Sequence, residues 1–310
     1  MFSWVFDKFS ALDYTRFLGD YQSGKSRGID VIGCISYRPI FISGALTEAV
    51  LFRMIEKYKG TLVINEADIK QSDTENYIIK ILNEGYEKRG AVIRLEKNGE
   101  KYDEIAYRVY SPKILATRKP FQDEATESRC YTIRMEETTR EDIPYNLDEE
   151  FYSSAQELRN KLLQFRFDMY WKDLKPVSLK DLKIEPRLRQ TFSSLLSIIS
   201  SGEVRRKLEE SMQKKQKKLI ENRQSSVEYE ILVIALNLIQ AHGKARIKAI
   251  SEKLNSVLQP KYPYTPQGIG KKLRDNLSLE TKKDNQGSYL IDCDKFSARL
   301  KKYGIDKVIL

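Results

Sequence analysis

Short apolar runs alternate with amphipathic stretches through the first 140 residues. The apolar runs have the length and the flanking turn residues of buried strands, and they cover residues 13–18, 38–44, 61–65, 112–120 and the end of 124–135. The stretches between them repeat their apolar positions at helical spacing, and they cover residues 25–37, 46–60 and 74–90. Strands that alternate with helices are typical of a parallel sheet, so the sequence predicts an α/β fold for residues 1–140.

Two segments depart from this alternation. In residues 91–110, apolar and polar positions alternate on both sides of Asn98 and Gly99, which is the strongest short signal for a β-hairpin. The N-terminal residues 1–17 mix aromatic with acidic residues and have no small-residue cleavage site. They therefore predict an amphipathic helix rather than a signal peptide.

Helical patterns dominate after residue 140. Residues 141–202 hold two helical segments, the second of which begins at Pro186, and residues 203–226 read as a highly charged linker helix. Residues 227–310 show three helices, two short strands around residues 285–287 and a closing helix. Three helices followed by a β-hairpin is the order of a winged helix, so we expect a separate small domain at 227–310.

Composition narrows the class of protein. No apolar run reaches the roughly 18 residues that a membrane-spanning helix needs. The three cysteines are far apart and His242 is the single histidine, which argues against a structural zinc site and against histidine-dependent nucleophilic catalysis. The sequence therefore favours a protein of the reducing cytoplasm.

The net charge of +10 is carried by the C-terminal third. Residues 1–200 hold 31 Lys and Arg against 31 Asp and Glu, whereas residues 201–310 hold 23 against 13. A neutral first part and a basic second part indicate a motor domain joined to a domain that binds a polyanion such as DNA. A solvated lysine-rich surface would produce the same charge.

A phosphate-binding pattern follows the first predicted strand. Residues 19–26, hereafter the 19–26 loop, match G-x-x-x-x-G-K-S, a pattern that also occurs by chance in surface turns. Here a strand precedes it and a helix follows it, which favours nucleotide binding. Backbone N–H groups of such a loop cradle phosphates, its lysine reaches the β- and γ-phosphates, and its serine hydroxyl binds Mg²⁺. The expected ATP-binding residues are Gly19, Asp20, Tyr21, Gln22, Ser23, Gly24, Lys25 and Ser26.

A second part of this site is expected where the strand 61–65 ends. Glu66 directly follows that strand and is the candidate for polarising the attacking water. Before it stands Asn65, where such sites usually have an aspartate. An asparagine carbonyl can accept hydrogen bonds from metal-bound water but supplies no charge. The sequence therefore does not determine how strongly the site binds Mg²⁺. Asp68 could compensate in part.

From about residue 13 to residue 200 the sequence resembles the AAA+ ATPases. It is most similar to the helicase-like ATPases of archaeal and phage mobile elements, whose relatives include the superfamily 3 and minichromosome-maintenance helicases. The resemblance implies that Thr117 senses the γ-phosphate, that Arg129 is an arginine finger acting on a neighbouring subunit, and that 141–202 form a helical lid. Arg187, or alternatively Arg189, would be the sensor arginine of that lid.

The same resemblance implies a ring, expected to be a hexamer, around DNA. The 91–110 hairpin would then project into a central channel and grip DNA through Lys97 and Lys101. Two plainer interpretations stay open, namely a surface hairpin whose lysines serve solubility, and Arg129 as an ion-pairing residue.

In the predicted winged helix, the third helix would enter the major groove of DNA and the strand pair would reach phosphates. The residues expected to contact DNA are Gln267, Lys271, Lys272 and Arg274 on the helix, and Lys282 and Lys283 on the wing. A protein-binding winged helix is the alternative.

Together these patterns predict an ATP- and Mg²⁺-dependent DNA helicase or translocase that acts in DNA replication. Two alternatives belong to other classes. One is an ATP-gated initiator or loader that binds an origin, and the other is a DNA-binding protein whose ATPase site is degenerate at Asn65.

Overall fold

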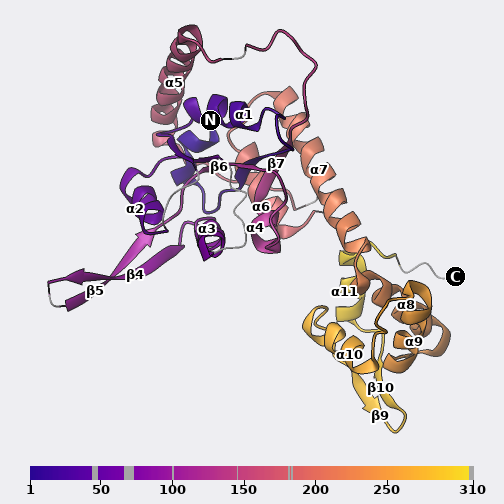
Figure 1. Ribbon diagram of the computed structural model, residues 1–310. Coiled ribbons are helices and arrows are strands. Elements are labelled where there is room, and N and C mark those ends of the chain that lie inside the picture. The colour runs from indigo at the N-terminus through magenta and orange to yellow at the C-terminus, as the bar shows by residue number, and fades with distance from the viewer. Residues whose placement is uncertain are drawn as a thin grey trace. The chain divides into compact units, whose positions relative to one another are not determined.

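A computed structural model describes residues 1–43, 48–65, 73–99, 101–144, 146–180, 182 and 184–306. The chain forms two compact units, unit 1 from Met1 to Arg205 and unit 2 from Arg206 to Leu310 (Figure 1). The segment 141–202 belongs to unit 1, and a helix that begins at Gly202 continues into unit 2.

The core of unit 1 is a parallel sheet of five strands. The strands are β1 (Tyr14–Leu18), β2 (Ile40–Ser43), β3 (Leu62–Asn65), β6 (Lys113–Thr117) and β7 (Cys130–Arg134), in the order β2-β3-β6-β1-β7. Each contact between neighbours is parallel. Their near-continuous apolar sequences suit a sheet that is covered on both faces. The predicted α/β fold is confirmed.

Helices cover the two faces of this sheet. Successive residues of a strand point to opposite faces, so Ile114 packs with Ile29 of α1 (Lys25–Cys34), while Leu115 belongs to the cluster on the other face. That other cluster contains residues of α2 (Glu48–Tyr58) and α3 (Asp73–Glu84). All three helices were predicted, although α1 and α3 end earlier than their patterns suggested.

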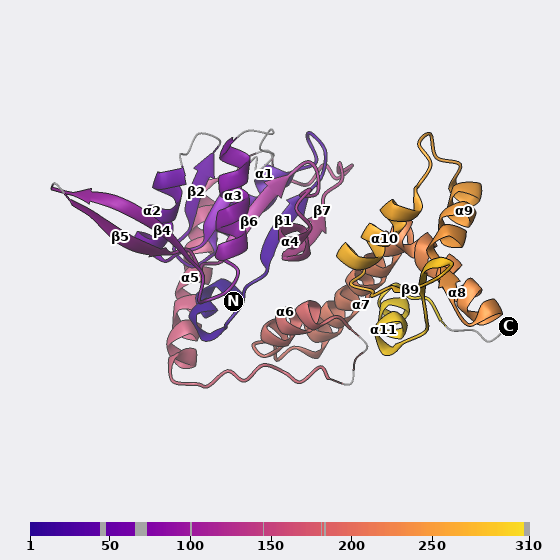
Figure 2. The ribbon, with the colours of Figure 1, turned by 90° about the horizontal axis from the view of Figure 1, so that it is seen from below.

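The predicted hairpin is confirmed. Strands β4 (Ala91–Asn98) and β5 (Lys101–Arg108) pair antiparallel with each other and with no other described strand. The hairpin projects outward from unit 1 beside α2, as two perpendicular views show (Figures 1 and 2). A short helix, α4 (Glu124–Ser128), then connects β6 to β7.

The N-terminal amphipathic helix was predicted incorrectly. Residues 1–9 form two short 3₁₀ turns, η1 (Phe2–Trp4) and η2 (Phe6–Lys8). The reason is tertiary packing, because the consecutive residues Trp4, Val5 and Phe6 are all buried and would span about 200° of a helix, more than one helix face covers. Helix α5 (Glu149–Tyr170) packs on this segment, and helix α6 (Pro186–Leu196) begins with proline, as expected.

Unit 2 contains a helical core with a small sheet. After α7 (Gly202–Gln224) come α8 (Val227–His242), β8 (Ala245–Arg246), α9 (Ile247–Leu258), α10 (Pro266–Asp275), β9 (Lys282–Asp284), β10 (Gly287–Leu290) and α11 (Asp294–Lys302). Gly243 ends α8 in the left-handed conformation at φ 73°. The sheet is antiparallel with the order β8-β10-β9. The two-residue strand β8 was not predicted, because two residues show no period.

Candidate nucleotide site and DNA-binding surfaces

The 19–26 loop connects β1 to α1 at the carboxyl edge of the parallel sheet. Ligands of open parallel sheets bind beyond this edge. The Gly19 N–H donates to the Thr117 carbonyl at 3.3 Å, which ties the loop to β6, and the Gly28 N–H donates to Gly24 at 2.9 Å as α1 begins. The strand, loop and helix that the pattern required are therefore all present.

Both glycines of the loop are required by its geometry. A Cβ at Gly19 would lie 2.4 Å from the Met135 carbonyl oxygen and 2.6 Å from Ser23 Oγ, closer than any side chain tolerates. Gly24 has φ +79°, a conformation that residues with a Cβ rarely adopt. As the residue before α1, Gly24 also brings no side chain to cap the helix, so the first N–H groups of α1 remain available to an anion.

The Lys25 side chain is hydrogen-bonded to the backbone of the 19–26 loop itself. The Lys25 ammonium donates to the Asp20 carbonyl and lies 3.4 Å from Ser23 Oγ. Ser23 Oγ in turn donates to the same carbonyl at 2.7 Å. A phosphate oxygen is a stronger acceptor than a carbonyl for an ammonium, so the arrangement suits phosphate binding.

Two further predicted residues come to the same edge. Ser26 Oγ donates to Asn65 Oδ1, the last residue of β3, at 3.3 Å. Thr117 ends β6 and pairs with Leu18, the residue before the loop. Its side chain is 1% exposed, and its hydroxyl has no hydrogen-bond partner among the described residues. The structure thus brings the 19–26 loop, Asn65 and Thr117 together, whereas Glu66 and Asp68 lie outside the described residues.

The two predicted arginines lie at the opposite edge of the sheet. The Arg129 carbonyl accepts the Tyr14 N–H at 2.9 Å, which places Arg129 at the start of β1. Its guanidinium lies over the Tyr86 ring, 5.1 Å from the centroid, and its buried Nε and Nη1 have no partner in the described part of the chain. The five residues of β1 separate it from the loop by about 13 Å of strand.

Arg187 is on this edge too, since it donates to the Ser128 hydroxyl next to Arg129. It therefore does not lie beside the 19–26 loop of its own chain. The alternative, Arg189, donates to the Leu182 and Ile184 carbonyls at 3.4 and 3.3 Å and so holds the backbone before its own helix.

Sequence reasoning missed three features of unit 1. Arg118, next to Thr117, lies over the Tyr21 ring at 4.6 Å and contacts its hydroxyl. Arg16, in the middle of β1, is buried and forms a 2.5 Å ion pair with Glu127. Lys113 is buried at the start of β6, where burial lowers its pKa to about 7. The signal for the last two was a charge inside an apolar strand.

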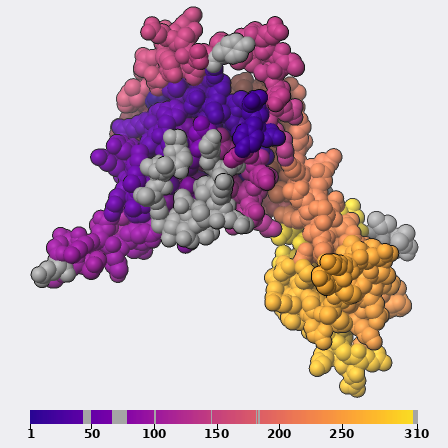
Figure 3. Space-filling model, viewed as in Figure 1, coloured from indigo at the N-terminus to yellow at the C-terminus, as the bar shows by residue number. Residues whose placement is uncertain are grey.

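The hairpin places its predicted lysines near the tip. Asn98 pairs with Lys101 and Lys97 pairs with Tyr102 on either side of Gly99, whose φ is 65°. The hairpin rests on α2, where Glu96, two residues before Asn98, forms an ion pair with Arg53. The tip itself has no such support from the described residues (Figure 3).

In unit 2, α10 presents three of the four predicted residues together. Gln267, Lys271 and Arg274 are exposed and have the spacing of one helix face. Lys272 instead forms a 2.9 Å ion pair with Glu228 of α8. Burial raises the pKa of the Glu228 carboxyl, but the hydrogen bonds from Lys272 and Asn276 outweigh this effect. The pKa of Glu228 therefore lies below its ordinary value.

The β9–β10 turn carries the remaining two predicted residues. Lys282 and Lys283 are exposed on β9. Asp284, the last residue of that strand, forms ion pairs with Arg246 at 2.9 Å and Lys244 at 3.2 Å. The hydrogen bond from Arg246 holds the pKa of Asp284 far below its ordinary value, so this turn is firmly braced at neutral pH.

Among the described residues, no helix is long and apolar enough to cross a membrane. The same residues contain no group of three or more His, Cys, Asp or Glu that could hold a metal ion. The two predicted Mg²⁺ contacts, Ser26 and Asn65, lie side by side.

The sequence matches no family profile and no curated protein. Among solved structures, the chain is similar to the apo A form of the NrS-1 C-terminal region, with a TM-score of 0.40 and 13% identity over 94% of this chain and 69% of that one. It is also similar to JCV helicase bound to an acetamide compound (TM-score 0.29, 10% identity, 73% of this chain and 57% of that one) and to JCV helicase in a second structure (TM-score 0.27, 13% identity, 64% and 54%). The chain thus spans a little over half the length of the JCV helicase chains.

Proposed function

We propose that this chain is an ATPase of the AAA+ class and works as an ATP-driven DNA helicase or translocase in DNA replication, in the cytoplasm. One observation carries the proposal. A glycine-dependent loop with Lys25 and Ser26 stands between β1 and α1, and Asn65 and Thr117 lie at the same edge of the sheet.

The residues of this edge fit ATP and Mg²⁺. Gly24 leaves the start of α1 without a side-chain cap, and Thr117 offers a buried hydroxyl that lacks a partner among the described residues. The metal supplies charge that offsets the charge of the phosphates. Ser26 and Asn65 would hold it, Lys25 would bind the β- and γ-phosphates, and the Thr117 hydroxyl would donate a hydrogen bond to a γ-phosphate oxygen. Glu66 would orient the attacking water.

The opposite edge supports an assembly in which subunits act on one another. Arg129 and Arg187 lie at the edge of the sheet opposite the 19–26 loop of their own chain. We propose that both reach the nucleotide of a neighbouring subunit, with Arg129 stabilising the charge that develops during hydrolysis. Arg187 would then act between chains rather than within one. We propose a closed ring for this assembly, with six subunits as the resemblance to AAA+ helicases implies.

Unit 2 supplies the proposed contact with DNA. Its helices and its three-stranded sheet follow the order of a winged helix, with α10 as the recognition helix and the β9–β10 turn as the wing. Gln267, Lys271, Arg274, Lys282 and Lys283 are all exposed, which suits contacts to base edges and phosphates. Lys272 is proposed to hold α10 against α8 instead.

The experiment that tests this function is steady-state ATP hydrolysis, with and without single- and double-stranded DNA. The wild type is compared with Lys25→Ala, Glu66→Gln and Arg129→Ala. We expect hydrolysis that DNA stimulates and that each variant loses, because arginines acting in trans are worth roughly 10³ to 10⁵ in rate in other ATPases. Wild-type protein that binds ATP but does not turn it over would contradict the motor.

The second candidate is an ATP-gated initiator or loader. The balance of charge on the hairpin favours it, because Lys97 and Lys101 are accompanied by as many acidic residues along residues 91–108. Neutralising both lysines should abolish unwinding in a motor, whereas an initiator should keep its DNA binding. A DNA-binding protein with a degenerate site would bind ATP without hydrolysis.

A further inference from the structure

The β4–β5 hairpin has two different faces. In an antiparallel pair, directly opposite residues lie on the same face. One set, which we name the open face, contains Ala91, Ile93, Leu95, Lys97, Tyr102, Glu104, Ala106 and Arg108. The other set, the packed face, contains Val92, Arg94, Glu96, Asn98, Lys101, Asp103, Ile105 and Tyr107.

Contacts with α2 involve the packed face. The Tyr107 ring lies 4.6 Å from the Phe52 ring, and the Arg94 guanidinium lies over the same ring at 5.5 Å. Glu96 accepts hydrogen bonds from both Arg53 and Tyr107. One side of the hairpin is thereby fixed to α2, from Tyr107 to Glu96.

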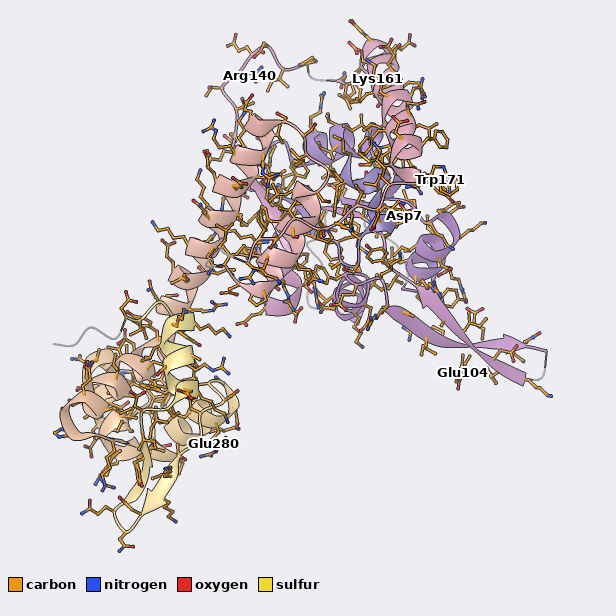
Figure 4. The ribbon with its side chains drawn as sticks, turned by 180° about the vertical axis from the view of Figure 1, so that it is seen from behind. Asp7, Glu104, Arg140, Lys161, Trp171 and Glu280 are labelled. Carbon is orange, nitrogen blue, oxygen red and sulfur yellow. The ribbon has the colours of Figure 1, made fainter. Side chains whose placement is uncertain are left out.

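The open face is apolar and exposed to solvent. Ile93, Leu95 and Tyr102 are 63%, 65% and 66% exposed, although their side chains share one surface. Glu104, on the same face, is labelled on the projecting part of the hairpin, with no other element beside it (Figure 4). A two-stranded hairpin is marginally stable by itself, and clustered exposed apolar side chains mark interaction sites. Both points indicate that this face is covered in the working protein.

The charge of the hairpin indicates a protein partner rather than nucleic acid. Residues 91–108 carry four basic side chains and four acidic ones, namely Arg94, Lys97, Lys101 and Arg108 against Glu96, Glu100, Asp103 and Glu104. Binding to a polyanion draws on an excess of cations, which this segment lacks. The balanced charges and the aliphatic centre of the open face suit a protein surface.

We infer that the open face docks on the open face of a second copy of this chain, in a two-fold contact. When two hairpins stack with the tip of one over the base of the other, the four rows of the face match in pairs. Ile93 of each copy meets Leu95 of its partner, and Arg108 meets the ring of Tyr102. Lys97 meets Ala91 and Glu104 meets Ala106, so no like charges face each other.

The other two-fold arrangement, with both tips at the same end, is less favourable. It would place Leu95 against Glu104 and would leave Arg108 against Ala91. Leu95 would then face a carboxylate and Ile93 only Ala106, which gives up most of the gain from burial. Complementarity therefore selects the arrangement with opposed tips.

The contact is small. A strand of eight residues is about 27 Å long and a pair of strands about 10 Å wide, so one face covers roughly 270 Å². Specific interfaces typically bury about 800 Å² on each partner. The hairpins alone should therefore associate weakly, at high protein concentration or when other contacts bring the copies together. This contact is separate from the head-to-tail contact of the proposed ring.

The test is sedimentation equilibrium of the full chain over a wide range of concentration, without nucleotide. We compare the wild type with Leu95→Glu and Ile93→Lys on the open face and Asp103→Asn on the packed face as the matched control. Either open-face variant should weaken self-association about tenfold or more, because two buried aliphatic contacts become polar. The control should associate like the wild type.

A mixture of the Leu95→Glu and Ile93→Lys chains sharpens the test. In the arrangement with opposed tips, the new carboxylate of one chain meets the new ammonium of the other, so the mixture should associate more strongly than either variant alone. Open-face variants that associate like the wild type would overturn the inference. So would variants that lose only DNA binding, or a mixture without recovery. If Arg129→Ala loses the proposed ring, the hairpin contact should still form, and the two proposals can therefore fail independently.

Discussion

The Ser26 hydroxyl donates to Asn65 Oδ1 across 3.3 Å, and this bond joins the start of α1 to the end of β3. The two oxygens stand where a metal bound to nucleotide phosphates would need ligands. Asn65 fills this position with a neutral carbonyl, so the site lacks one negative charge that an aspartate would supply.

Asn65→Asp should therefore strengthen Mg²⁺ binding. The two side chains have nearly the same shape, and a full charge near a divalent cation is worth more than a dipole. We expect the Mg²⁺ concentration for half-maximal ATP hydrolysis to fall by about tenfold, a change of roughly 1.4 kcal/mol in binding. Asn65→Ala, the control, should raise it. An unchanged magnesium dependence in Asn65→Asp would count against a metal at this position.

Thr117→Val should separate stability from function. The hydroxyl is buried without a partner in the described chain, and such a group costs about 1 to 3 kcal/mol of stability. In the absence of nucleotide, the variant should therefore be more stable by about 1 kcal/mol in chemical unfolding. Its ATP hydrolysis should be impaired, because the γ-phosphate loses a donor. A variant that is less stable and fully active would contradict both expectations.

The elements that the sequence predicted well are those with a local cause. Buried strands such as β3 and β6 can be recognised in the sequence as apolar runs, and Asn98–Gly99 specifies the hairpin through its turn geometry. The 19–26 loop was visible in part because Gly24 adopts a left-handed conformation that residues with a Cβ rarely adopt. These causes lie within a few residues of one another along the chain.

The features that escaped prediction depend on partners distant in sequence. Arg187 lies beside Ser128 because α6 packs at the amino edge of the sheet, where Thr191 donates to Asp13 at 2.6 Å. The N-terminal segment forms 3₁₀ turns because its aromatic side chains insert beside α5. Lys272 has the same spacing signal as Lys271, and only the position of Glu228 distinguishes the two.

Lys113 should make unit 1 more stable at alkaline pH. Its ammonium donates to the Val109 and Ser111 carbonyls at 3.0 Å and to the Gly85 carbonyl at 3.3 Å, and burial lowers its pKa from 10.5 to about 7. Between these two pKa values the unfolded chain binds more protons than the folded chain. Stability must therefore rise with pH from about 7 to 10.5, by up to about 1.4 kcal/mol per pH unit.

The comparison is with Lys113→Met, which has a similar length and no charge. This variant should be less stable overall, because three carbonyls lose their donor. The decisive quantity is the pH dependence of the difference in unfolding free energy between the two proteins, measured in urea at pH 7 and pH 9.5. That difference should widen in favour of the wild type as the pH rises, and a constant difference would refute the lowered pKa of Lys113.

Arg129 should act on a neighbouring subunit, which mixing can reveal. Lys25→Ala chains should fail to bind ATP yet still offer Arg129, whereas Arg129→Ala chains should bind ATP without the arginine. Each variant alone should be inactive, and the mixture should regain hydrolysis because some interfaces combine a working loop with a working arginine. Arg187→Ala in place of Arg129→Ala should behave in the same way. Mixtures that stay inactive, although the chains co-assemble, would rule out action between subunits.

Lys271 and Lys272 are neighbours on α10, but only Lys271 should contribute to the salt dependence of DNA binding. Lys271 is exposed beside Gln267 and Arg274, while Lys272 is paired with Glu228 at 2.9 Å. A lysine that neutralises one phosphate contributes about 0.9 to the slope of log K against log salt concentration. Lys271→Ala should therefore weaken binding to duplex DNA and reduce that slope by about 0.9, and Arg274→Ala should do the same. Lys272→Ala should leave the slope unchanged and lower the thermal stability of unit 2, because Glu228 loses its main partner.

Fluorescence anisotropy at several salt concentrations measures the slope. Equal reductions in Lys271→Ala and Lys272→Ala would mean that charge alone, and not the exposed face of α10, determines the contact with DNA.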